Sequence, residues 1–281
     1  MSEGWSPAAG RAEIEAALAG LGRGPDAEIA VAEAALLLAA LDRPRVGLER
    51  YRAHLTELSL QVAQRAAVDL VSRWEALNEV LFEVFGYAGD RQTYDDLQNA
   101  NLIRVIDRRR GLPVALAILY LHAARAQGWS AEALRFPGHV VVRLQAGEGR
   151  LILDPFDGGR RLQPQDLRAL AKAVGGDAAE LTPEHVAAMS NRELLLRLQN
   201  NIKLRRLQAG DAEGGLAALE TMLRLAPGDW QLWREAAGLH LRAGNLHAAA
   251  LALEHVAALA DQPEARAQAD RARQAIHAKL N

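Results

Sequence analysis

Apolar residues recur at helical spacing along much of the chain, which predicts a series of buried or amphipathic helices. The segment 27–41 is apolar nearly all round, so we expect a buried helix that ends just before Pro44, because proline disfavours helix in the residue that precedes it. Further helices are predicted over 48–62 and 74–85, and Gly86 is placed to form the left-handed cap of the latter.

The middle of the chain changes from helical to alternating periodicity. An apolar helix is predicted over 114–125, and short β-like segments follow at 131–136, 139–144 and 151–154. Two glycines lie between the last two segments, as is typical of a hairpin. This pattern predicts a mainly α protein with a small antiparallel β-sheet, of the α+β class.

The C-terminal third carries an internal repeat. Gly210 and Gly244 lie 34 residues apart, which is the tetratricopeptide period. In that register other apolar or small positions coincide, namely Leu219 with Leu253, Met222 with Val256, and Gly215 with Ala249. We expect an array that begins with a helix at 190–208, after a Ser190/Glu193 capping box, and closes with a helix near 263–280. Such units bury their apolar faces only by stacking into an α-solenoid.

Two motifs in the middle of the chain carry residue types that are common in catalytic sites, Phe136-Pro-Gly-His139 and Asp154-Pro-Phe-Asp-Gly-Gly159. A hairpin that turns at Ala146-Gly147 would place His139 directly opposite Asp154, with Cβ atoms about 4.5–5.5 Å apart. An aspartate in that position orients and charge-stabilises an imidazole. A slip of one residue would put the two side chains on opposite faces of the hairpin.

The sequence leaves four roles open for His139 and Asp154. They form a hydrogen-bonded pair that holds the hairpin to the apolar helix, or they line a remnant pocket that binds a ligand without chemistry. Alternatively, His139 acts as a general base on water, or the pair joins Asp157 as metal ligands. No ligand-spacing motif supports a metal site, and we predict no metal and no cofactor.

The same motifs, together with Arg110-Gly-Leu-Pro113 and Gly128, resemble the transglutaminase-like domain of the Sir-B-type bacterial proteins. The stretch Tyr94–Leu102 is also similar to that family, which joins the domain to C-terminal tetratricopeptide helices. The resemblance implies a catalytic cysteine at the start of the apolar helix, followed by a histidine and an aspartate that match His139 and Asp154.

The cysteine that this resemblance implies is missing. Its position falls at about Pro113, and no residue from Gly111 to Leu119 is Cys, Ser or Thr. The whole chain contains no cysteine, so covalent acyl transfer of the family type has no nucleophile.

Together these observations divide the 281-residue chain into three parts. We predict a flexible or weakly helical N-terminus over 1–24, a transglutaminase-like domain over 25–188, and tetratricopeptide-like helical repeats over 189–281. The formal net charge of −2 gives no general attraction to nucleic acid or to anionic membranes. The most apolar run is too short to span a bilayer and no signal peptide is apparent, so we expect a cytoplasmic protein.

Two polar clusters are candidate binding surfaces. On the first helix of the array, Asn200, Asn201, Lys203, Arg205 and Arg206 either line a peptide-binding groove or simply face solvent. Arg110 belongs to a basic cluster with Arg104, Arg108 and Arg109, which is either a solvated helix end or a site for an anion or an acidic partner.

The sequence therefore predicts a non-catalytic interaction or scaffold protein that binds an unidentified protein or peptide through its repeat groove. A hydrolase of amide or ester bonds, in which His139 and Asp154 activate water, is the alternative, and a small-ligand sensor is a third possibility.

Overall fold

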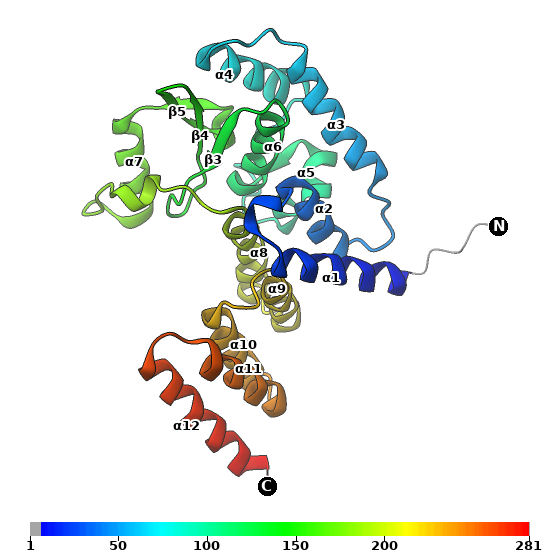
Figure 1. The fold of residues 1–281 in the computed structure, drawn as a ribbon, viewed down its shortest axis with the longest axis vertical. Coiled ribbons are helices and arrows are strands. Elements are labelled where there is room, and N and C mark those ends of the chain that lie inside the picture. The colour runs from blue at the N-terminus through cyan, green and yellow to red at the C-terminus, as the bar shows by residue number, and fades with distance from the viewer. Residues whose placement is uncertain (1–6, 281) are drawn as a thin grey trace, which may run out of the picture. The chain divides into compact units, whose positions relative to one another are not determined.

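The computed structural model describes residues 7–280, which form two compact units (Figure 1). Unit 1 holds the described residues up to Ile14 together with Asp26–Leu198, and unit 2 holds Glu15–Pro25 together with the described residues from Gln199 onward. Both units are mainly helical, and unit 1 also contains a four-stranded antiparallel sheet. The predicted fold class is confirmed. No helix within the described residues has the length and apolar content needed to cross a membrane.

The helices of unit 1 follow the apolar pattern of the sequence. They are α2 (Val31–Leu41), α3 (Glu49–Ala63), α4 (Leu70–Asn78), α5 (Leu102–Arg108) and α6 (Pro113–Ala126). Most residues of α2 and α6 are buried, as their nearly continuous apolar sequence predicts. Helix α6 has Pro113 at its first position, where the fixed φ of proline suits a helix and its missing N–H leaves no donor unsatisfied.

The helix predicted over 74–85 is divided in two. Helix α4 ends at Asn78, and a π-helical turn, η2 (Glu79–Val84), continues it. The backbone N–H of Phe85 reaches back five residues to the carbonyl oxygen of Val80, at 3.0 Å. Gly86 follows with a φ of 69°, so its predicted left-handed conformation is confirmed.

The sheet consists of β3 (Ser130–Ala133), β4 (Val142–Ala146), β5 (Gly149–Asp154) and β6 (Arg160–Leu162), paired in that order. Val142 pairs with Leu153, whereas the predicted register would pair it with Leu151. The turn contains Gly147 and Glu148, and Gly147 takes a left-handed φ of 56° that suits a two-residue hairpin loop. The predicted register was wrong by two residues, a shift that keeps every side chain on its original face.

Small elements complete unit 1. A core of Leu134, Phe136, Val141, Leu162, Leu167 and Ala171 joins the sheet to α7 (Pro164–Gly175), and α6 packs on β3 and β4. Two short strands, β1 (Ala88–Gly89) and β2 (Arg110–Gly111), pair in parallel. Four short 3₁₀ helices are η1 (Asp26–Glu28), η3 (Leu97–Ala100), η4 (Pro155–Asp157) and η5 (Pro183–Val186).

The repeat helices are α8 (Asn191–Gln208), α9 (Ala212–Leu225), α10 (Trp230–Arg242), α11 (Leu246–Leu259) and α12 (Pro263–Leu280). Gly210 and Gly244 follow α8 and α10 with φ values of 79° and 75°, so both positions of the predicted repeat have the same backbone conformation. A Cβ atom at Gly215 would collide with the side chain of Leu207, and the matching Ala249 is fully buried. Close helix packing therefore explains why both positions hold small residues.

The limits of the two units differ from the predicted boundaries. Residues 7–23 form helix α1 (Pro7–Arg23), although a flexible or weakly helical segment was expected over 1–24. Leu18 is fully buried, and Gly22 lies so close to the backbone of Arg224 that a Cβ atom would collide with it. The two compact units divide within α8, after Leu198, whereas the predicted domain boundary lies at 188/189. Residues 1–6 of the predicted segment lie outside the described residues.

A candidate site around His139 and Asp154

The structure brings His139 and Asp154 into direct contact. Nε2 of His139 lies 2.9 Å from Oδ1 of Asp154, and the two side chains are 12% and 9% exposed. His139 lies in the loop before β4, and Asp154 is the last residue of β5. A two-residue shift of the register keeps Asp154 on the expected face of the hairpin, and the loop before β4 brings the imidazole of His139 to it.

Three further contacts hold this pair in place. Oδ1 of Asp154 also accepts a hydrogen bond from the backbone N–H of Phe156 at 3.0 Å, as the cap of η4. The Phe156 ring meets the imidazole edge to face, with centroids 5.9 Å apart. Arg197 donates from Nη2 to the carbonyl oxygen of His139 at 2.8 Å. The orientation of the imidazole is therefore set by the carboxylate, the aromatic ring and the backbone together.

The hydrogen bond decides which ring nitrogen is available for chemistry. An ionised Asp154 only accepts hydrogen bonds, so the proton between the two residues belongs to Nε2 of His139. In the neutral imidazole, Nδ1 then holds the free lone pair. Nδ1 is the atom that would act as a general base.

No nucleophile stands at the start of α6. The first residues of this helix are Pro113, Val114 and Ala115, and their side chains are buried and apolar. The sequence contains no cysteine anywhere, and Gly111–Leu119 contains no serine or threonine. The arrangement therefore offers an oriented imidazole without the thiol that acyl transfer of the family type requires.

Asp157 does not join the pair. Its Oδ1 lies 2.8 Å from Nη2 of Arg91 and its Oδ2 lies 3.0 Å from Nε of Arg160. Both carboxylate oxygens are thus engaged by guanidinium groups. Among residues 7–280, no group of three or more histidine, aspartate or glutamate side chains is arranged to hold a metal ion.

Three further side chains lie around the pair, and only one of them carried a signal in the sequence. Tyr94 meets Phe156 edge to face at 5.8 Å, and the guanidinium of Arg91 lies over the Phe156 ring at 5.2 Å. Tyr94 carried a signal only as part of the family-like stretch. Arg91 and Arg197 carried none, because neither belongs to a motif and both approach the site through the tertiary fold.

The basic cluster around Arg108 is largely structural. Arg108 donates to the buried Asp90 at 3.0 Å and to the fully buried Asn99 at 3.0 Å. Asp90 also accepts from the hydroxyl and the backbone N–H of Thr93, and these hydrogen bonds, with those from Asn99 and Arg108, hold its pKa well below the usual range. Arg108 thus neutralises a buried carboxylate and is not a solvated helix end.

Arg109 is also engaged, whereas Arg110 is exposed. Arg109 adopts a left-handed φ of 58°, and its Nη1 lies 2.6 Å from the hydroxyl of Tyr87 and 2.7 Å from Nε2 of His54. Burial, followed by the positive charge of Arg109, lowers the pKa of His54 to about 4. Arg110 lies on β2 with its side chain exposed, and its assignment as a binding residue stays a prediction.

The binding residues predicted on α8 fall into different environments. Asn200 and Asn201 are half-buried, and Nη1 of Arg205 donates to Oδ1 of Asn201 at 2.8 Å. Lys203 is 3% exposed, and its Nζ lies 2.6 Å from Oε2 of Glu235. Arg206 lies 2.8 Å from Asp211. Contact of these residues with a partner stays a prediction, and the burial of Lys203 makes it the least accessible of them.

A sequence profile described as the transglutaminase-like superfamily matches residues 49–200. The chain belongs to this superfamily. A tetratricopeptide repeat profile matches residues 202–277, which confirms the repeat predicted from glycine spacing. This transglutaminase-like protein therefore combines the superfamily domain with repeats that suggest protein partners.

Bacterial relatives are similar in sequence to this transglutaminase-like protein over most of their length. A UPF0162 protein of Xylella fastidiosa is 30% identical over 188 residues, which are 64% of this chain and 67% of that protein. A UPF0162 protein of Pseudomonas aeruginosa is 28% identical and covers 83% of this chain and 86% of its own. Protein SirB1 of Salmonella typhimurium is 25% identical over 72% of this chain and 73% of its own. The resemblance to the Sir-B type is confirmed.

Proposed function

We propose that this member of the transglutaminase-like superfamily is a non-catalytic protein-interaction protein. The observation that carries the proposal is the missing nucleophile. The helix that should present it, α6, begins with buried apolar side chains, and the chain has no cysteine to replace it. The tetratricopeptide repeats support a protein partner, because stacked helix pairs form extended binding surfaces.

In this proposal the His139–Asp154 pair is structural. A single oxygen of Asp154 accepts hydrogen bonds both from the imidazole and from the backbone N–H that starts η4. The pair thus fastens the loop before β4 to the end of β5. Burial of both side chains favours this role, since a buried polar group needs a partner.

A hydrolase is the second candidate, because the same hydrogen bond orients the imidazole as a general base requires. The purified full chain should be assayed with p-nitrophenyl acetate, a glutamine peptide and a glutamyl-lysine isopeptide. We expect no turnover above that of the control variant His247→Ala, which changes an exposed histidine on α11. Turnover that falls at least about a hundredfold in His139→Ala would establish the hydrolase and refute the proposal.

The partner is sought separately. Chemical cross-linking in a native bacterial lysate, followed by mass spectrometry, should recover a stoichiometric protein partner. We propose that Asn200, Asn201 and Arg206 contribute to its binding, and that alanine at all three positions reduces recovery. The matched control is alanine at His247. Equal recovery from both variants would remove these residues from the proposal, and failure to recover any partner would oppose the proposed function itself.

A further inference from the structure

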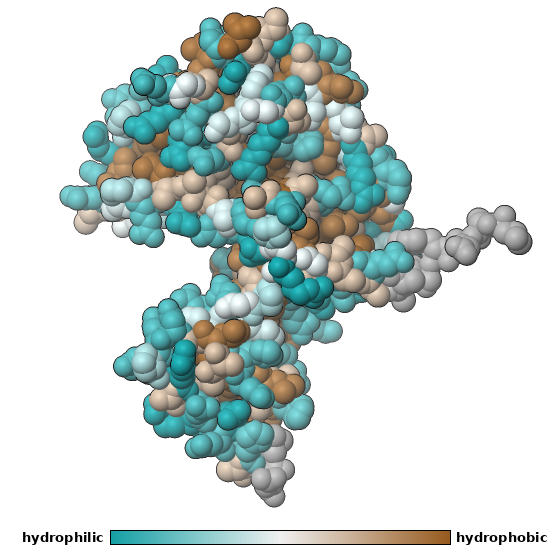
Figure 2. All heavy atoms as spheres, viewed as in Figure 1, coloured by the Kyte–Doolittle hydropathy of each residue, from teal (hydrophilic) through white to brown (hydrophobic). Residues whose placement is uncertain are grey.

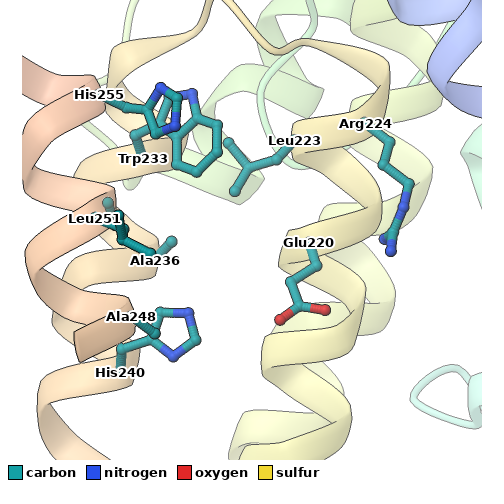
Figure 3. Close-up of a pocket in the computed structure, with 10 residues that line it drawn as sticks. Glu220, Leu223, Arg224, Trp233, Ala236, His240, Ala248, Leu251 and His255 are labelled. Carbon is teal, nitrogen blue, oxygen red and sulfur yellow. The ribbon is translucent and has the colours of Figure 1, made fainter. Parts of the chain in front are cut away.

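Unit 2 contains a cavity of about 470 Å³ between α9, α10 and α11 (Figure 3). Helix α9 contributes Glu220 and Leu223, α10 contributes Trp233 and His240, and α11 contributes Leu251 and His255. The volume lies within the range of about 300–1,000 Å³ that is typical of ligand pockets. None of the residues predicted on α8 lines it. The cavity is therefore a second candidate surface that the sequence did not indicate.

One wall of the cavity is held in a fixed position. The rings of Trp233 and His255 are stacked, with centroids 3.9 Å apart and planes 15° from parallel. Nε1 of Trp233 donates to the carbonyl oxygen of Pro227 at 2.8 Å, which fixes the indole. Small side chains, among them Ala236 and Ala252, also line the cavity. The space exists before any ligand binds, so binding costs little reordering of the wall.

The cavity has a negative side. Glu220 directs its carboxylate toward the space between α9 and the other two helices (Figure 3). It forms no ion pair with any residue in the described part of the chain. Arg224, which also borders the cavity, points away from it and pairs with Glu15 at 3.4 Å. Glu220 is thus an exposed carboxylate at the edge of the cavity, without a protein counter-charge among the described residues, and it can pair with a cation of the ligand.

Apolar side chains form much of the remaining surface of the cavity. Leu251 is 50% exposed, and Leu259, two helical turns further along the same face of α11, is 39% exposed. Figure 2 shows hydrophobic residues exposed among hydrophilic ones over the C-terminal helices of unit 2. Nδ1 of His240 is a buried polar atom without a hydrogen-bond partner among the described residues. Unpaired groups of this kind in a native protein call for an explanation such as a missing ligand.

We propose that this cavity binds a peptide segment that presents a large apolar side chain with a lysine or arginine within one helical turn of it. The inference rests on the proposed function, since it assumes a protein partner. The apolar side chain enters between Trp233 and Leu251, and the cation pairs with Glu220. Exposed Leu259 extends the apolar surface beyond the cavity, which favours a segment of a polypeptide over a small isolated cation.

The probe is a phage-displayed library of random peptides, selected on the immobilised full chain. Selected peptides are synthesised with fluorescein, and their dissociation constants are measured by anisotropy. We expect enrichment of Leu, Met or Phe with Lys or Arg within four positions. Ala248 on α11 also lines the cavity (Figure 3). Glu220→Lys and the cavity-filling Ala248→Phe should each weaken binding about tenfold or more, the effect of losing one strong contact.

Glu254→Lys is the matched control, because Glu254 is exposed on α11 but does not line the cavity. It should leave the affinity unchanged. Circular dichroism must show that all variants are folded. Glu220→Gln, which only removes the charge, should lose less affinity than Glu220→Lys. Enrichment of acidic peptides, or equal binding by Glu220→Lys and Glu254→Lys, would overturn the inference.

The experiment separates this inference from the proposed function. If the selected peptides bind more weakly when Asn200 and Asn201 are changed to alanine, but bind the cavity variants normally, the peptides bind at α8 and the cavity proposal is refuted. If no peptide is selected while cross-linking still recovers a partner, the cavity proposal fails and the proposed function stands. Hydrolysis dependent on His139 would refute the proposed function and leave cavity binding to be judged by the anisotropy alone.

Discussion

The ion pair between Lys203 and Glu235 offers the sharpest test of the repeat unit. The Lys203 side chain is 4% exposed and that of Glu235 is 38% exposed, with 2.6 Å between Nζ and Oε2. The two partners therefore differ in what happens when the other is removed. Glu235→Gln leaves a buried ammonium without its counter-charge, whereas Lys203→Met leaves a carboxylate that water already reaches.

The asymmetry sets the expected magnitudes. Breaking a fully buried pair from one side costs about 3–5 kcal/mol, and exposed pairs contribute about 0–1 kcal/mol. Because Glu235 is more than a third exposed, solvent screens the pair, and we expect Glu235→Gln to cost about 2 kcal/mol. Lys203→Met replaces the buried charge with an apolar chain of similar length, so it should cost less than about 1 kcal/mol.

Urea unfolding of the full chain, followed by circular dichroism and tryptophan fluorescence, measures the difference. Glu235→Gln should lower the midpoint of the unit 2 transition by about 1 M, and the double variant with Lys203→Met should recover most of that loss. Glu254→Gln, an exposed carboxylate on α11, is the control and should have little effect. If Lys203→Met were as damaging as Glu235→Gln, the assignment of Lys203 as a buried, compensated charge would be refuted.

Two further predictions concern unit 1. Gly159→Ala should lower the free energy of unfolding in urea by about 3 kcal/mol, because Gly159 has a φ of 69° and a Cβ atom would collide with Asn78. Gly158 has a φ of 63° but open space around it, so the control Gly158→Ala should cost only about 1 kcal/mol. Equal losses in the two variants would contradict the collision. The pKa of His54 is about 4 in the folded state against 6.5 ordinarily, so the unfolded state binds more protons between those values. The free energy of unfolding should rise with pH through that window, and His54→Gln should make this rise smaller. If the dependence on pH is the same in the variant, His54 does not titrate as described.

Periodic features of the chain were predictable because they depend on local spacing. The apolar pattern located α2, α3 and α6 to within a few residues. The 34-residue spacing of Gly210 and Gly244 correctly indicated two equivalent positions of a repeat, because each glycine takes a positive φ directly after a helix. The missing cysteine also needed no structure, since composition alone excludes the nucleophile.

The candidate site was predictable only in part. The His139–Asp154 contact was expected from the hairpin, and it formed because the actual register differs by an even number of residues. The same local reasoning could not find Arg197, which lies 58 residues from the His139 carbonyl oxygen that it contacts. Contacts between distant segments leave no periodic trace in a single sequence.

By itself, then, the sequence determined the element types, the repeat and the absence of a cysteine nucleophile, because these depend on residue identity and short-range spacing. Only the tertiary structure decided which charged residues are accessible. Lys203, predicted from sequence either to line a groove or to face solvent, is buried against Glu235. Arg108 is half-buried and pairs with the buried Asp90. The cavity beside Trp233 likewise exists only where α9, α10 and α11 meet. Burial is a property of packed neighbours, which a one-dimensional pattern does not specify.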